Sequence, residues 1–171
     1  MTVEGVAARF GLEPMPVEGG LFCQTWAGPV VNGRPVGTAI LVLLSPDPRH
    51  FSALHRLPID EVWHFHAGDP IELLLLHPGG RSQVIRFGGD VDAGDTPQVV
   101  VPAGTWMGAR LVHGGAWGLF GTTMAPGFMP ADYEGGEADE LAAAWPTHDA
   151  LIRALCRAGA ARRHAPGAFG G

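Results

Sequence analysis

Residues 51–72 read FSALHRLPIDEVWHFHAGDPIE, and this stretch indicates the fold. Apolar and polar side chains alternate on both sides of Pro58, which is typical of short strands that bury one face. Gly68 and Pro70 then supply a turn before the next apolar run. The stretch therefore predicts three consecutive strands, at 52–57, 61–66 and 71–77, that carry histidines and a glutamate among apolar residues.

The same pattern of short strands and turns extends in both directions along the chain. Gly (26) and Pro (15) are abundant among the 171 residues and fall between the apolar runs, which favours an all-β sandwich or barrel over a helical bundle. The further predicted strands are 21–26, 36–44, 83–87, 98–101, 107–112 and 117–124, and Asn32-Gly33 marks a tight turn. Helical patterns are confined to the ends: one capped by Thr2 and closed by Gly11, and two within 138–157.

Composition excludes several classes of function. All 11 basic residues are arginines, and 17 acidic residues leave a net charge of −6, so neither a nucleic-acid partner nor a membrane partner is expected. The apolar runs fall far short of a membrane span of roughly 20 residues. Cys23 and Cys156 are isolated, as in reduced proteins. We therefore expect a cytoplasmic protein with one domain at 1–158 and a disordered tail at 159–171.

Two motifs resemble those of the cupin superfamily. His55, Glu61 and Gly68 have the spacing of the first cupin motif, and Pro102-Ala-Gly104-Thr-Trp-Met107 resembles the second. The match is most detailed with the type 5 cupins, over Glu18-Gly-Gly and over 51–75, 98–108 and 125–128, although Met15 stands where that branch has a histidine. The resemblance implies a double-stranded β-helix, the jelly-roll barrel of sugar-nucleotide epimerases, and a homodimer that exchanges the strand at 21–26.

The resemblance also implies a degenerate metal site. Metal-binding cupins use two histidines and a glutamate from the first motif and a histidine from the second. Here His55 and Glu61 match, whereas Leu57 and Met107 occupy the other two positions. We expect no cofactor. A weak divalent metal, held by His55, Glu61 and His64, remains an alternative.

The predicted pocket contains His55 and Glu61 as catalytic residues, with His55 as the base and Glu61 orienting it. His64, Gln98 and Trp106 are predicted to bind the ligand. In an unbroken strand Glu61 and His64 face opposite ways, so both reach one pocket only if the strand bulges or begins after Glu61. His66, by contrast, is expected at a rim, because a turn separates it from Glu72.

Three functions remain open from the sequence. The first is a small-molecule-binding cupin that works without a metal, as an isomerase, epimerase or lyase on a polar, sugar-like metabolite. An epimerase would ordinarily use a lysine and a tyrosine, whereas this chain has no lysine and its only tyrosine, Tyr133, is expected beyond the barrel. The second is a metal-assisted enzyme, and the third is a cupin that binds a ligand or serves as a scaffold without catalysis.

Overall fold

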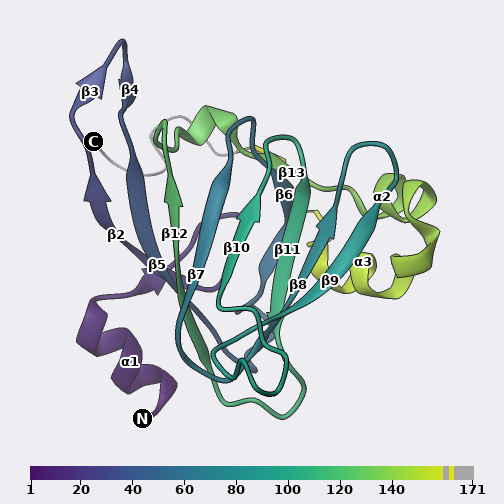
Figure 1. Cartoon of the computed structure of the whole chain (residues 1–171), viewed down its shortest axis with the longest axis horizontal. Helices are drawn as coiled ribbons and strands as arrows, with labels where there is room; N and C mark the ends of the chain where they lie inside the picture. The colour runs from purple at the N-terminus through teal and green to yellow at the C-terminus, as the bar shows by residue number, and fades with distance from the viewer. Residues whose placement is uncertain (160–161, 164–171) are drawn as a thin grey trace.

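Two antiparallel sheets face each other across an apolar interior in the computed structural model, which describes residues 1–159 and 162–163 (Figure 1). The first sheet has the strand order β1-β2-β5-β12-β7-β10, and the second has β13-β6-β11-β8-β9. Apart from the pairs β1–β2 and β8–β9, neighbours in each sheet are not consecutive in the chain, as in a jelly roll. The all-β jelly-roll prediction is confirmed.

The longer strands match the strands predicted from the sequence to within about two residues at either end. Their bounds are β2 Leu21–Ala27, β5 Thr38–Leu44, β6 Ser52–Arg56, β7 Glu61–Gly68, β8 Ile71–Leu76, β9 Ser82–Phe87, β10 Gln98–Val101, β11 Trp106–Leu111 and β12 Gly118–Met124. The sequence did not predict the two-residue strands β1 Glu13–Pro14, β3 Val30–Val31, β4 Arg34–Pro35 and β13 Glu134–Gly135. Two residues are too few to show a period.

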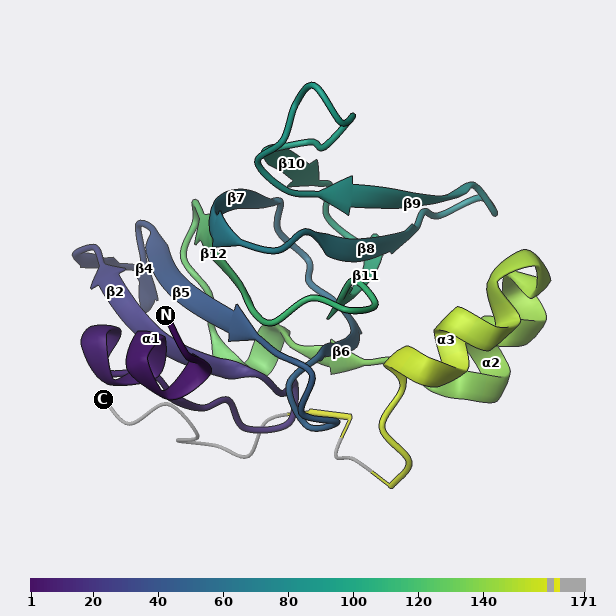
Figure 2. The ribbon, with the colours of Figure 1, turned by 90° about the horizontal axis from the view of Figure 1, so that it is seen from below.

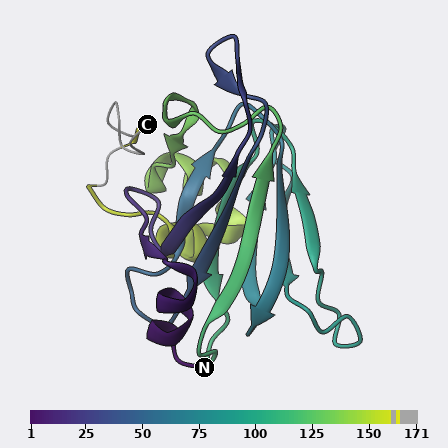
Figure 3. The same ribbon diagram turned by 90° about the vertical axis from the view of Figure 1, so that its left-hand side faces the viewer.

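The β3–β4 hairpin turns at Asn32 and Gly33, as predicted. Their φ angles are 53° and 81°, the left-handed conformation that a tight hairpin turn requires. The hairpin projects beyond the first sheet at the end away from α1 (Val3–Phe10) (Figure 3). Helix α1 begins and ends as predicted, with the Thr2 hydroxyl accepting from the Gly5 N–H at 3.1 Å and Gly11 in the left-handed conformation.

Apolar side chains pack in three layers. Leu73 and Leu75 of β8 point into the core between the sheets, whereas Leu74 and Leu76 point outward. The outward residues pack against the helices α2 (Ala138–Ala144) and α3 (Asp149–Leu155), which cover the second sheet (Figure 2). Helix α1 covers part of the first sheet through Val6 and Leu12. The run at 73–76 is therefore apolar on both faces because this chain's own helices cover it.

Two short 3-10 helices are also present, η1 (Pro130–Asp132) before β13 and η2 (Pro146–His148) between α2 and α3. The sequence predicts a disordered tail at 159–171. Of these residues the structure describes Gly159, Arg162 and Arg163, and the others lie outside the described residues. The Arg162 carbonyl accepts a hydrogen bond from the Gly135 N–H at 2.8 Å. Cys23 and Cys156 are unpaired and half-buried. Within the described residues, no helix has the length and apolar character needed to cross a membrane.

Candidate functional site

A cavity of about 630 Å³ is lined by the two residues predicted to be catalytic, His55 and Glu61. Strands of both sheets, the loop after β1 and the β3–β4 hairpin contribute to its wall. Its lining includes Glu13, Met15, Glu18, Phe22, Cys23, Gln24, Thr38, Ile40, His55, Leu57, Glu61, Thr122, Met124 and Phe128. A cavity of this size accommodates a small organic molecule.

His55 is buried on β6, and the backbone determines which of its ring nitrogens carries a proton. Its side chain is 3% exposed, and Nδ1 lies 2.8 Å from the carbonyl oxygen of Ala53. Because a carbonyl oxygen only accepts, Nδ1 carries the proton and donates it. The other nitrogen, Nε2, lies 3.9 Å from the Oε2 atom of Glu18, which lines the same cavity. In the neutral ring, Nε2 is therefore free to accept a proton.

Glu61 begins β7 and is buried at 6% exposure. Its Oε2 atom accepts a hydrogen bond from the Trp63 indole N–H at 2.8 Å, and the Thr122 hydroxyl also bonds its carboxyl group. Burial raises the pKa of Glu61, with His55 opposing that rise and Glu18 adding to it. Glu61 therefore keeps a proton to a higher pH than an exposed glutamate, which suits a proton donor.

Glu18 is the carboxylate that the sequence did not single out for the site. Its Oε1 atom accepts from the Ser52 hydroxyl at 2.7 Å, and its backbone carbonyl accepts from the Ala53 N–H at 2.9 Å. These contacts place a second carboxylate beside His55. Gly19 and Gly20, which follow Glu18, both have a positive φ that shapes the loop around it.

Tyr133 also belongs to the site, although its sequence context predicted a place beyond the barrel. The strand β13 pairs with β6 so that Gly135 lies opposite His55. This pairing brings the Tyr133 ring onto the His55 ring, with centroids 5.0 Å apart and planes 17° apart. Tyr133 is 1% exposed, and burial, with Glu18 as a second cause, raises the pKa of its phenol. The only tyrosine of the chain therefore supports the candidate base.

His64 and Gln98 do not share this cavity. They lie opposite each other on β7 and β10, and the Gln98 side-chain nitrogen is 3.1 Å from the His64 Nδ1 atom. The strand β7 continues unbroken from Glu61 past His64, and its register with β12 shifts only after Phe65. Strand alternation therefore puts His64 on the face opposite Glu61. The structure does not bring His64 and Gln98 into the pocket predicted to hold them with His55 and Glu61.

Trp106 is also outside the cavity lining. It is 8% exposed and packs with Leu54 and Leu141 beneath the C-terminal helices. The Arg56 guanidinium lies over its ring, 4.7 Å from the centroid. Trp106 therefore has a packing position on the outer face of the second sheet.

A family model described as "Cupin superfamily (DUF985)" matches residues 4–135. The chain belongs to the cupin superfamily. A search of curated proteins found no match.

Two solved structures are similar to more than nine-tenths of this chain. One, a protein from Shewanella oneidensis, is 30% identical with a TM-score of 0.83, over 92% of this chain and 98% of that one. The other, from Leishmania major, is 28% identical with a TM-score of 0.82, over 91% and 99% of the two chains. An oxalate decarboxylase from Lactobacillus farciminis is 11% identical with a TM-score of 0.54, over 87% of this chain and 43% of its own. That distant likeness shows the fold alone.

The donor set of this cupin does not fit a tightly held metal ion. Leu57 and Met107, at two of the four cupin ligand positions, are 3% and 1% exposed and lie in the apolar core. Met107 lies directly opposite His55 in the sheet. A histidine at position 107 would therefore lie next to His55. Residues 1–159 and 162–163 contain no group of three or more His, Cys, Asp or Glu side chains placed to hold a metal. The surviving polar residues instead suit proton transfer.

Proposed function

We propose that this cupin binds a small polar metabolite, such as a sugar derivative, and transfers a proton on it, as an isomerase, epimerase or lyase does. One observation carries the proposal: Nδ1 of the buried His55 donates to the Ala53 carbonyl at 2.8 Å. This bond leaves Nε2 as the acceptor in a cavity that also contains the carboxyl groups of Glu18 and Glu61.

The two carboxyl groups have different roles in this proposal. Glu18 is the carboxylate next to Nε2 and stabilises the imidazolium that forms when His55 takes a proton. Glu61, with its raised pKa, is the acid that returns a proton to the product. The Ala53 carbonyl orients His55, so Glu61 no longer has the orienting role expected from the sequence. Tyr133 keeps the ring in place by stacking.

A ligand-binding cupin without catalysis is the second candidate, and one observation favours it. Glu61 already bonds to Trp63 and Thr122, so the buried carboxyl group is satisfied without a substrate. In that case His55 and Glu61 would hold the strands together and line a binding cavity. The proposed reaction uses no metal, because Leu57 and Met107 occupy two of the four positions at which metal-binding cupins have ligands.

Deuterium incorporation separates the two candidates. Fructose, glucosamine and N-acetylmannosamine would be incubated with the protein in D₂O, and proton NMR would follow the hydrogen next to the carbonyl carbon. A proton-transfer site exchanges this hydrogen in at least one sugar, and His55→Gln abolishes the exchange. His113→Gln, on an exposed loop histidine, is the matched control and should exchange normally. Exchange at the buffer rate with all three sugars would contradict the proposal.

The homodimer also stays a proposal. The edge strand β2 pairs with β1 only at Phe22 and Leu21, and Trp26 near its end is 47% exposed. Within the described residues no strand pairs with the rest of this edge, and such an edge with an exposed tryptophan supports strand addition from a second copy. Light scattering across a range of concentrations tests it, and a monomer throughout would contradict it.

A further inference from the structure

The cavity is acidic. Glu13, Glu18 and Glu61 line it, and His55 is the one basic side chain among the described residues of its wall. No arginine lines it within the described part of the chain, and the sequence has no lysine. The cavity therefore stays negative whichever of His55 and Glu61 holds the proton between them.

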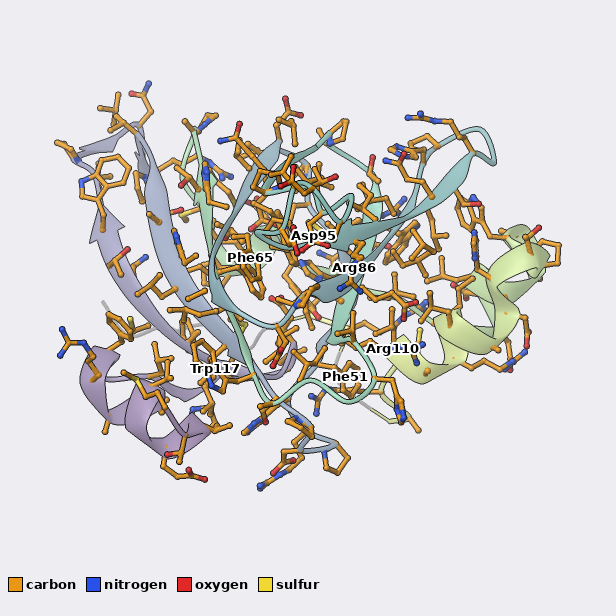
Figure 4. The ribbon with its side chains drawn as sticks, turned by 60° about the horizontal axis from the view of Figure 1, so that its bottom comes forward. Phe51, Phe65, Arg86, Asp95, Arg110 and Trp117 are labelled. Atoms are coloured by element: carbon orange, nitrogen blue, oxygen red, sulfur yellow. The ribbon has the colours of Figure 1, made fainter. Side chains whose placement is uncertain are left out.

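Arg34 and Arg86 are each paired with a carboxylate. Arg34, which lies between two lining residues of the hairpin, makes a two-pronged bond with Asp132 at 2.6 and 2.9 Å. Arg86 of β9 bonds Asp95 at 2.7 Å, and neither of these two residues, labelled in Figure 4, lines the cavity. These pairs leave their guanidinium groups little capacity to bind an anion at the cavity.

The rest of the wall is largely apolar. Met15, Phe22, Leu57, Met124 and Phe128 contribute carbon surface around the polar residues. Leu57 and Met124 are themselves 3% exposed. A ligand that fills about 630 Å³ must therefore place an apolar part against these side chains and a polar part against the carboxyl groups.

We infer that the cavity selects a cationic amphipathic ligand, an amine attached to an apolar group, and excludes anions. Glu18 is the ammonium's partner, because it reaches the cavity while its other oxygen is held by Ser52. An anion would lose water and face the carboxyl groups of Glu13 and Glu18, with His55 as the one basic side chain in the described wall. The inference rests on the proposed function and narrows it: among sugar-like metabolites it favours an amino derivative over an acid, a phosphate or a nucleotide sugar.

Three probes with the same apolar body test the charge preference. Binding of 4-phenylbutylamine, 4-phenylbutanol and 4-phenylbutyrate to the full chain would be measured by calorimetry at pH 7 and low salt. We expect the amine to bind about tenfold more tightly than the alcohol, and the carboxylate more weakly than the alcohol. Glu18→Gln should remove the advantage of the amine over the alcohol.

Glu4→Gln is the matched control, since Glu4 lies on α1 outside the cavity lining and its loss changes the net charge equally. Equal or tighter binding of the carboxylate would overturn the inference, and so would an amine preference that Glu18→Gln leaves intact. Binding of none of the three probes would also overturn it. In each of these cases the deuterium-exchange experiment still tests proton transfer independently, because it uses the three sugars and the His55→Gln variant instead of the three phenylbutyl probes and Glu18→Gln.

Discussion

His55 and Tyr133 stack with their ring centroids 5.0 Å apart and their planes 17° apart. Both side chains are nearly fully buried, and they come from segments that the short β13–β6 pairing brings together. The stack and the Ala53 hydrogen bond together leave the imidazole one orientation. Nε2 is therefore directed to the cavity by contacts on both the edge and the face of the ring.

Removing the Tyr133 ring should destabilise the fold. Tyr133→Ala opens a cavity beneath His55 and should lower the free energy of unfolding by about 3–5 kcal/mol. Tyr133→Phe keeps the stacked ring and should lose less than about 1.5 kcal/mol. Urea unfolding measures both. An equal loss in the two variants would place the stabilisation in the hydroxyl group rather than in the stack.

Glu61 should make stability depend on pH. Its pKa in the folded protein lies above the reference value of 4.5 because of burial. The folded state therefore holds more protons than the unfolded state between the two pKa values. Stability should fall as the pH rises above 4.5, by up to about 1.4 kcal/mol per pH unit for this one group, until Glu61 is fully ionised.

Glu61→Gln removes this titration and should give a flatter curve of stability against pH than the wild type. Urea unfolding of the two proteins between pH 5 and 8 measures the difference. The glutamine can still accept from the Trp63 indole, so the comparison isolates the charge. A wild type that gains stability relative to Glu61→Gln as the pH rises would show that Glu61 is stabilised as the anion.

The outer-face residues should not affect the cavity. His64→Ala and Gln98→Ala should each change the free energy of unfolding by no more than about 0.5 kcal/mol and leave the affinity for 4-phenylbutylamine unchanged. Trp106→Ala should lose about 3–5 kcal/mol, because it anchors the C-terminal helices. Thermal melting and calorimetry check these effects. Loss of ligand binding in His64→Ala would place His64 in the site after all.

Much of the fold could be predicted because its strands are long enough to show alternation. The same alternation predicts that Glu61 and His64 face opposite ways in an unbroken strand. The strand β7 is unbroken between these two residues. Glu18 could not be placed, because its bond to Ser52 joins residues 34 positions apart. The position of Tyr133 depends on β13, a strand of two residues, which is too short to show an alternating pattern. These contacts are tertiary, and local sequence carries little information about them.

Restoring the two missing imidazoles should create a metal site. In the double variant Leu57→His with Met107→His, the four cupin ligand positions are filled together with His55 and Glu61. We expect stoichiometric Zn²⁺ by elemental analysis and a metal-dependent rise in the melting temperature. The wild type, purified in the same way, should carry less than stoichiometric metal. A folded double variant that binds no metal would show that His55 and Glu61 are not positioned as ligands.

The protonated nitrogen of the His55 ring tests the account most directly. Two-bond proton–nitrogen NMR on protein with ¹⁵N-labelled histidine distinguishes the two ring nitrogens, and the signals absent from His55→Gln identify the residue. At a pH where the ring is neutral, we predict the proton on Nδ1 and a bare Nε2. A neutral ring with the proton on Nε2 and a bare Nδ1 would contradict the Ala53 hydrogen bond and remove His55 as the base.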